Sequence, residues 1–451
     1  MQTVTLAITA IFSLLALTLP PAYALAAYVT CLLWYPTFLV LTIGTIDMPV
    51  SRIVVGVLLL RCLCDGRIRS RFTWSRLDTW VALSMLVYCG AALSASDTPL
   101  SETLESQGGI LMNTWFAYMV TRFIVTDRAR LISIVKCISL ALVPLAILGV
   151  FECVTGRYQF ALLWRFSPWF MGGGVVPSPR FGLSRAVGPF SHSILFGCGF
   201  ALFLPLIYYL RHEKDHWHSL AYVLFAVAVV GALSSMSSGP WVMVIAVIFC
   251  LTVQRYKHWL KPLLIFFVFS CIFIAIASNR PFYHVVASFA NPLGGAGWHR
   301  AKVIDLAIEH FDEWWLDGYG GKDPGWGPEL GMVRTDVTNE FIAAAVRYGV
   351  FGMIALCIVL TKAFRGIFYT YRITTDPYLK SLYWSLGSAL SSATVAWMSV
   401  TFFGQLKPLF YCLLGIIGSS FYFVGHHETG QRSLITNQSD IILAQGQLKS
   451  L

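Results

Sequence analysis

The residues best suited to chemistry lie in two long polar segments, residues 152–188 and about 279–338, of an otherwise apolar chain. Both segments contain several arginines, and guanidinium groups bind phosphate through bidentate hydrogen bonds. Clustered at a membrane face, such groups suit a diphosphate or an anionic lipid headgroup. The alternative is that single arginines only bind ordinary anionic lipid or cap helix ends. The candidate diphosphate ligands are Arg180, Arg185, Arg300 and Arg334.

The second segment also contains a predicted helix and several aromatic residues. Apolar side chains recur at three- and four-residue steps over residues 299–316, which predicts a helix lying across the outer end of a helix bundle at the membrane surface. Gly318 follows as its left-handed cap. The alternative is a packed loop helix with no substrate contact. The apolar row is Ile304, Ala307, Ile308, Phe311 and Trp315, and the aromatic candidates for stacking on a sugar ring are Trp298, Tyr319 and Trp326.

Polar residues cluster where this segment returns to an apolar run. Asn339 and Glu340 open that run, and Arg347 lies two helical turns further on the same face as Glu340. A charged residue inside a span is costly and usually faces a cavity or a partner. Glu340 and Arg347 therefore form either a structural ion pair or, with Asn339, the polar floor of a cavity for a lipid phosphate.

The composition places these segments in a membrane protein. Of 451 residues, 57% are hydrophobic and only 12% are charged, and the mean hydropathy is +0.69. Apolar runs of about 20 residues recur from end to end, which is typical of spanning α-helices and excludes the shorter alternating segments of a β-barrel. The net charge of +10 is explained by cytoplasmic anchoring charges and a basic outer site, so we expect no nucleic-acid partner. The 11 cysteines fall within or beside apolar runs, and neither a metal site nor a cofactor is expected.

The predicted fold is an all-α polytopic membrane protein with about 12 or 13 transmembrane helices. Residues 1–424 form a single membrane domain, and residues 425–451 form a polar cytoplasmic tail. Basic loops alternate with the others, which places residues 152–188 and 279–338 on the outer side. Whether residues 4–19 and 22–43 both span, with the N-terminus outside, stays open. The predicted spans are 4–19, 22–43, 50–63, 77–93, 108–125, 131–151, 189–210, 220–233, 240–253, 262–277, 339–360, 382–400 and 408–424.

Three stretches resemble conserved patterns of the bacterial O-antigen ligase and polysaccharide polymerase family. RAVGPFSHSILFGCGFALFLPL (185–206) resembles the family's R-x-x-G-x-F-x-H-P-N pattern at a middle span. WHRAKVIDLAIEHFDEWWLDGYG (298–320) is similar to its loop helix, and TNEFIAAAVRYGVFGM (338–353) to its HNxFLExLxExGxxG pattern. The three keep the family's order and cover roughly residues 151–360.

The resemblance implies a glycosyltransferase of the bacterial inner membrane that acts on the periplasmic face. Its donor would be an undecaprenyl-diphosphate-linked oligosaccharide and its acceptor a glycan, with membrane lipid and polysaccharide export or chain-length proteins as further partners. By position, Arg185 and Arg300 inherit the diphosphate-binding role. Two positions depart from the family: Thr338 replaces a histidine thought to activate the acceptor, and residues 237–239 read SSG where the family often has SRG. Both departures favour a divergent exopolysaccharide polymerase over an O-antigen ligase.

The predicted reaction displaces a lipid diphosphate from an anomeric carbon by an acceptor hydroxyl. Cations around the leaving diphosphate would supply most of the catalysis, with Arg185, Arg300 and Arg334 as candidates. The acceptor hydroxyl benefits from a base, for which Asp336 is the nearest carboxylate and His192 and His299 are alternatives. Two other function classes stay open: a transporter or flippase of lipid-linked sugars, and a non-catalytic component of an export complex.

Overall fold

The computed structural model describes residues 1–44, 46–95, 99–167, 177–256, 258, 260–279, 281–289 and 297–423. The polar tail predicted at residues 425–451 lies outside the described residues. Among the described residues nearly all regular structure is helical, and one two-stranded hairpin is the exception. The elements are α1 Gln2–Thr18, α2 Pro21–Trp34, β1 Val40–Ile43, β2 Ile46–Pro49, α3 Val50–Cys64, α4 Gly66–Arg69, α5 Arg76–Ser94, α6 Leu100–Leu111, η1 Met112–Phe116, α7 Ala117–Ile124, α8 Arg128–Thr155, α9 Ala161–Trp164, α10 Ser193–Tyr209, η2 Leu210–His212, α11 Trp217–Ser234, α12 Ser238–Arg255, α13 Leu260–Ala277, α14 Phe282–Phe289, α15 Gly297–Glu309, α16 Phe311–Trp314, η4 Pro328–Leu330, α17 Glu340–Ile373, α18 Pro377–Trp397 and α19 Leu406–Ser420.

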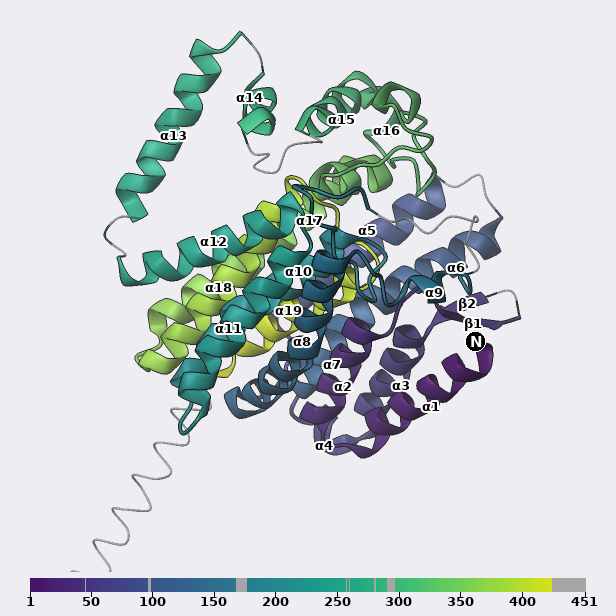
Figure 1. Ribbon diagram of the computed structural model, residues 1–451, viewed down its shortest axis with the longest axis vertical. Coiled ribbons are helices and arrows are strands. Elements are labelled where there is room, and N and C mark those ends of the chain that lie inside the picture. Colours follow the sequence, from purple (N-terminus) through teal and green to yellow (C-terminus); the bar gives the residue numbers. More distant parts are fainter. Residues whose placement is uncertain are drawn as a thin grey trace, which may run out of the picture.

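The all-α membrane class is confirmed. Six helices are long and apolar enough to cross a bilayer, namely α5, α8, α10 with η2, α11, α12 and α17. Shorter apolar helices accompany them, namely α1, α2, α13 and α19. In Figure 1 the long helices pack side by side, while α15 and α16 lie together over one end of the bundle.

Several predicted boundaries are wrong for local reasons. The span predicted at 22–43 is helical only to Trp34, and its last residues form strand β1, paired with β2. Pro36 follows this end and cannot donate the backbone hydrogen bond that a continuing helix needs. Helices predicted to start at Pro240 and Pro408 begin two residues earlier. Each proline thus lies in the first turn, where its missing N–H costs nothing.

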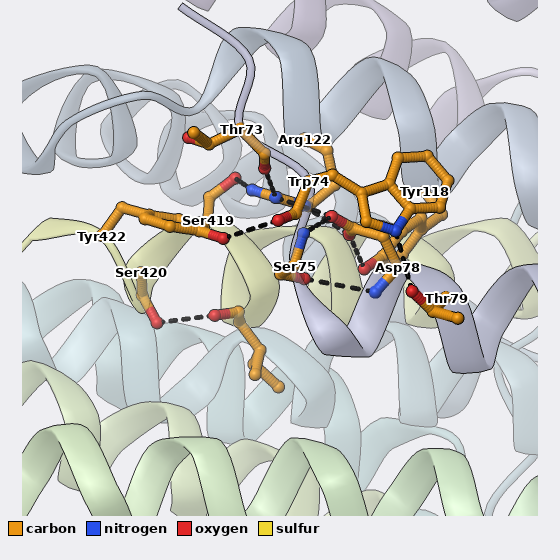
Figure 2. Close-up of polar contacts among 11 residues, drawn as sticks. Thr73, Trp74, Ser75, Asp78, Thr79, Tyr118, Arg122, Ser419, Ser420 and Tyr422 are labelled. Atoms are coloured by element: carbon orange, nitrogen blue, oxygen red, sulfur yellow. Dashed lines mark hydrogen bonds and ion pairs between the residues drawn. The ribbon is translucent and has the colours of Figure 1, made fainter.

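Two ends of the bundle can be distinguished by what the helices contact there. The last residue of α5, Ser94, donates to Asp317 (2.8 Å) beside α15 and α16. At the other end of α5, the buried Asp78 carboxylate pairs with Arg122 of α7, with 2.7 Å between Nε and Oδ1. Figure 2 shows this cluster: Arg122 also donates to the Thr73 carbonyl (2.6 Å) and to Ser419 of α19 (3.1 Å). The cluster joins three helices at the end remote from α15 and α16.

The segment over the other end of the bundle has a small core of its own. The single helix predicted over residues 299–316 is divided at His310 into α15 and α16. The apolar row noted in the sequence is only partly buried, because Ala307 is 5% exposed whereas Ile308 is 60% and Phe311 48% exposed. Val303, Leu306 and Trp314, which lie beside that row, complete the buried face. That core contains Val303, Leu306, Ala307, Trp314, Trp326 and Leu330, packed on Ala345 and Val346 of α17.

This segment is docked by backbone hydrogen bonds on a break in α17. The break lies at Tyr348 and Gly349, and Gly349 has φ +69° and ψ 179°, a conformation open almost only to glycine. The carbonyls of Val346 and Arg347 accept from the N–H groups of Tyr319 (2.8 Å) and Gly320 (3.0 Å). Groups freed by the break are thereby satisfied. Gly318 has the predicted left-handed conformation, with φ +72°.

Candidate functional site

Three of the four predicted phosphate-binding arginines converge on the turn between α11 and α12. Arg185 donates from Nη2 to Ser237 Oγ (2.9 Å), and Arg300 from Nη2 to Ser238 Oγ (3.0 Å). Arg180 donates from Nη1 to the Met236 carbonyl (3.3 Å). Residues 180 and 185 precede α10 in the chain, whereas residue 300 lies in α15 more than a hundred positions later. The fold therefore assembles from distant segments the cluster that we call the arginine site.

The positive charge of the arginine site is not neutralised within the described part of the chain. No carboxylate there pairs with Arg180, Arg185 or Arg300, and the buried Nε atoms of Arg185 and Arg300 have no hydrogen-bond partner. Burial, and then the charge of Arg180, lowers the pKa of Arg185 to about 10. The same two causes lower the pKa of Arg300. Both guanidinium groups remain charged at neutral pH. An anion bound at the arginine site would therefore be stabilised by all three arginines.

Glu152 holds the loop that carries Arg185. Its carboxylate is fully buried and accepts hydrogen bonds from the N–H groups of Val187 (2.9 Å) and Gly188 (2.8 Å). Gly188 has φ +53°, and a Cβ there would meet the Phe196 ring at 2.8 Å. Sequence reasoning missed Glu152 as a site residue and placed it in the outer loop. The available signal was an acidic residue at the end of an apolar run, where a buried charge needs partners.

His192 lies beside the arginine site as the N-cap of α10. Its Nδ1 accepts from the Ile194 N–H (3.1 Å), so a neutral ring carries its proton on Nε2. Burial, and after it the charges of Arg185 and Arg180, lowers the pKa of His192 to about 4. At neutral pH this side chain is thus an uncharged hydrogen-bond donor. The base role predicted for His192 does not fit this geometry.

His192 also lines a cleft of about 690 Å³ between the outer segment and the start of α17. Four of the predicted site residues share this cleft: His192, Arg334, Asp336 and Arg347. Thr338, at the position of the family histidine, lines it too, and its buried hydroxyl has no partner.

Asp336 is the acidic group of this cleft best placed to act as a base. Its side chain is exposed, and no described residue pairs with its carboxylate. Asp323, the other acid in the cleft, accepts from the N–H groups of Gly325 (2.9 Å) and Thr335 (3.1 Å) and so serves to order its loop. His299 is buried outside the cleft lining, and its Nε2 bonds to the Asp336 carbonyl (2.9 Å). His299 therefore helps to position the backbone at Asp336 and does not line the cleft.

The predicted ion pair between Glu340 and Arg347 is wrong. Glu340 pairs with Lys407 instead (3.6 Å) and accepts from the Phe402 N–H (2.7 Å). Asn339 caps α17 by accepting from the N–H groups of Phe341 (3.0 Å) and Ile342 (3.2 Å).

The aromatic candidates have different environments. Trp326 is only 2% exposed and stacks on His310 within the small core, so its face is not available to a sugar. The Tyr319 hydroxyl donates to Glu313 (2.6 Å), and its ring packs edge-on against Trp326. Trp298 is 63% exposed, and its ring remains open to a ligand.

Within the described residues, no group of three or more His, Cys, Asp or Glu side chains is arranged to hold a metal ion. The arrangement instead offers guanidinium groups for an anion, a neutral imidazole donor and one free carboxylate. Comparison of the chain with protein-family models and with curated proteins gave no match.

Proposed function

We propose that this protein is a glycosyltransferase that transfers or polymerises a glycan from a polyprenyl-diphosphate donor, such as undecaprenyl diphosphate, without a metal. The observation that carries the proposal is the arginine site, where three guanidinium groups without carboxylate partners meet. A lipid diphosphate offers the charge and the oxygen atoms that such a site lacks. A cleft with a free carboxylate lies beside it, where an acceptor hydroxyl could be activated.

In the proposed reaction the acceptor oxygen attacks the anomeric carbon while the bond to the lipid diphosphate breaks. The diphosphate leaves as an anion, and Arg180, Arg185 and Arg300 stabilise its developing charge. Asp336 takes the proton of the acceptor hydroxyl. His192 donates from Nε2 to a phosphate oxygen. The acceptor proton ends on the Asp336 carboxylate, and the released lipid diphosphate keeps the electrons of the broken bond.

At residues 237–239, where the sequence departs from the family pattern, the missing arginine is replaced by one from another segment. Ser238 stands where the family often has arginine, and the Arg300 guanidinium bonds to the Ser238 hydroxyl (3.0 Å). A guanidinium group is therefore present at this turn, supplied by α15. This substitution supports the proposal of a divergent polysaccharide polymerase.

The helix directions support the larger of the two predicted span counts. Gln405 Nε2 contacts the carbonyls of Tyr35 (3.4 Å) and Pro189 (3.1 Å), so α2 ends near the arginine site. Arg61, at the far end of α3, bonds to the carbonyl of Ala16 near the end of α1 (2.6 Å). The first helix thus begins at the end that carries the arginine site. We propose about 13 spans with the N-terminus and the site on the periplasmic face of a bacterial inner membrane.

A transporter or flippase of lipid-linked sugars is the second candidate, favoured by the break in α17. Transporters use broken helices to expose backbone groups to their substrate. Here the carbonyls freed at Val346 and Arg347 are occupied by Tyr319 and Gly320. The glycosyltransferase proposal therefore ranks first.

Binding of undecaprenyl diphosphate to purified protein tests the proposal. Arg185→Ala and Arg300→Ala should each weaken binding about 10- to 150-fold, because a hydrogen bond to a charged group contributes about 1.5–3 kcal/mol. Arg157→Ala is the matched control, because Arg157 is exposed in the same outer segment. Undecaprenol, which lacks the diphosphate, should bind equally to all variants. Unchanged diphosphate affinity in both site variants would contradict the proposal.

Deletion of the gene separates the function classes in cells. Accumulated single repeat units on the lipid carrier would indicate a polymerase, and long carrier-linked chains without transfer would indicate a ligase. Units confined to the cytoplasmic face would indicate a flippase and refute the transferase. Unchanged lipid-linked glycans with impaired export would indicate a non-catalytic component.

A further inference from the structure

A second, smaller cavity adjoins the cleft and takes no part in the reaction proposed above. It has a volume of about 150 Å³ and is lined by α5, α17, α18, α19 and the residues before α19. Its wall shares Ala343, Arg347, Thr401 and Phe403 with the cleft. A ligand could therefore lie in the cavity and extend into the cleft where Asp336 lies.

Seven of the 17 residues that line the cavity are aromatic. Tyr88 of α5 stacks on Tyr348 at the break in α17, with ring centroids 4.5 Å apart. Trp397 lies 4.5 Å from Phe410, centroid to centroid, on another side. The faces of such rings carry partial negative charge and attract the polarised C–H groups of a sugar ring.

The same wall contains polar groups that lack partners. Among the described residues, the buried Tyr348 hydroxyl and Trp397 indole N–H have no hydrogen-bond partner. Tyr88 and Tyr411, each only 6% exposed, bring two further hydroxyls to the wall. Buried polar groups are almost always hydrogen-bonded in folded proteins. Two such groups, together with the neighbouring Tyr88 and Tyr411 hydroxyls, indicate a ligand with several hydroxyl groups, because hydroxyls both donate and accept.

Charge and size narrow the choice of ligand. Glu340 and Lys407 pair at 3.6 Å in the wall, which also contains Arg347, and all three side chains can hydrogen-bond the hydroxyls of a polyol. A cavity of about 150 Å³ accommodates one six-membered ring. We propose that this cavity binds a single sugar ring of the acceptor glycan and directs one of its hydroxyls into the cleft toward Asp336. Its identity as the acceptor subsite rests on the proposed function, whereas sugar binding itself does not.

Saturation-transfer NMR on the full-length protein in nanodiscs tests the proposal. The probes are the methyl glycosides of glucose, galactose, mannose and N-acetylglucosamine. At least one should bind the wild type, and Ala344→Phe, which fills the cavity, should abolish its signal. Tyr88→Phe and Tyr411→Phe keep the ring and remove the hydroxyl, and each should weaken binding about two- to tenfold. Tyr28→Phe is the matched control, because Tyr28 is equally buried in α2 outside the cavity.

The results separate this inference from the proposed function. The inference is overturned if no probe binds the wild type or if binding survives Ala344→Phe. If Ala344→Phe does not fold, unchanged glycoside binding in both Tyr88→Phe and Tyr411→Phe overturns the inference. Glycoside binding should persist in Arg185→Ala, which impairs only diphosphate binding. Glycoside binding without any undecaprenyl diphosphate binding would leave the sugar site standing and refute the transferase. Binding of undecaprenyl diphosphate without glycoside binding would refute the sugar site and leave the transferase proposal standing.

Discussion

Breaking the buried pair of Asp78 and Arg122 should destabilise the helix bundle strongly. In Asp78→Asn the Arg122 side chain, which is only 4% exposed, keeps its positive charge. It loses the carboxylate that accepts hydrogen bonds from its Nε (2.7 Å) and Nη2 (2.9 Å). Removing one partner of such a pair costs about 3–5 kcal/mol, because the other charge stays buried. An asparagine can still accept the hydrogen bond from the Ser75 N–H that Asp78 accepts (2.6 Å). The substitution therefore removes the negative charge but keeps this cap of α5.

The double variant Asp78→Asn/Arg122→Met separates the charge from the packing. It removes the unpaired cation, so it should be at least about 2 kcal/mol more stable than Asp78→Asn alone. It still loses the contacts of Arg122 with the rings of Phe72 and Tyr422, about 0.5–1 kcal/mol each.

The measurement is the free energy of unfolding in mixed detergent micelles, from a denaturant titration followed by circular dichroism. Affinity for undecaprenyl diphosphate per folded molecule should not change, because the pair lies at the end of α5 remote from the arginine site. A loss below about 1 kcal/mol in Asp78→Asn, or a double variant no more stable than the single one, would refute this reasoning.

Three further predictions concern the site itself. Glu152→Ala should lower stability by about 2 kcal/mol or more and weaken diphosphate binding, because it leaves two buried backbone N–H groups unpaired; unchanged affinity would contradict its positioning role. Gly349→Ala should make residues 297–339 sensitive to limited proteolysis, because the new Cβ would lie 2.1 Å from the Leu316 carbonyl oxygen, whereas Gly331→Ala, with a similar φ of +68° but open space, should not. The pKa of His192 falls from its ordinary 6.5 to about 4 on folding, so the unfolded chain binds more protons between these values and stability declines as pH falls through them. His192→Asn keeps an N-cap acceptor and should lose less thermal stability between pH 7.5 and pH 5 than the wild type does. An identical loss in the two proteins would show that His192 is not the titrating group.

Helix formation in this chain follows closely from local sequence. Apolar runs predicted α5, α8, α11 and α12 nearly to their ends, because each backbone group of a helix bonds four residues away. The break at Gly349 was not predicted, because its cause is the loop 315–320 that packs against it. Which apolar residues of α15 and α16 are buried was not predicted either, because two adjacent rows are apolar and only contact with α17 distinguishes them.

The candidate site shows the same division. Arg185, Arg300 and Asp336 could be singled out from the sequence, because they lie in the two long polar segments. Their partners could not, because Ser237 and Ser238 come from another segment and His299 lies 37 positions before Asp336 in the chain. Helical spacing offered Arg347 as one possible partner of Glu340, whereas the fold pairs Glu340 with Lys407 of α19.

The sequence by itself determined that this is a helical membrane protein with arginine-rich polar segments, because hydropathy and helix length are local properties. Only the tertiary structure decided that Arg180, Arg185 and Arg300 meet at one turn and that Glu152 holds their loop. It also decided that an aromatic cavity with buried polar groups adjoins the cleft. The physical reason is that those contacts join residues far apart in the chain, whose approach depends on how the helices pack.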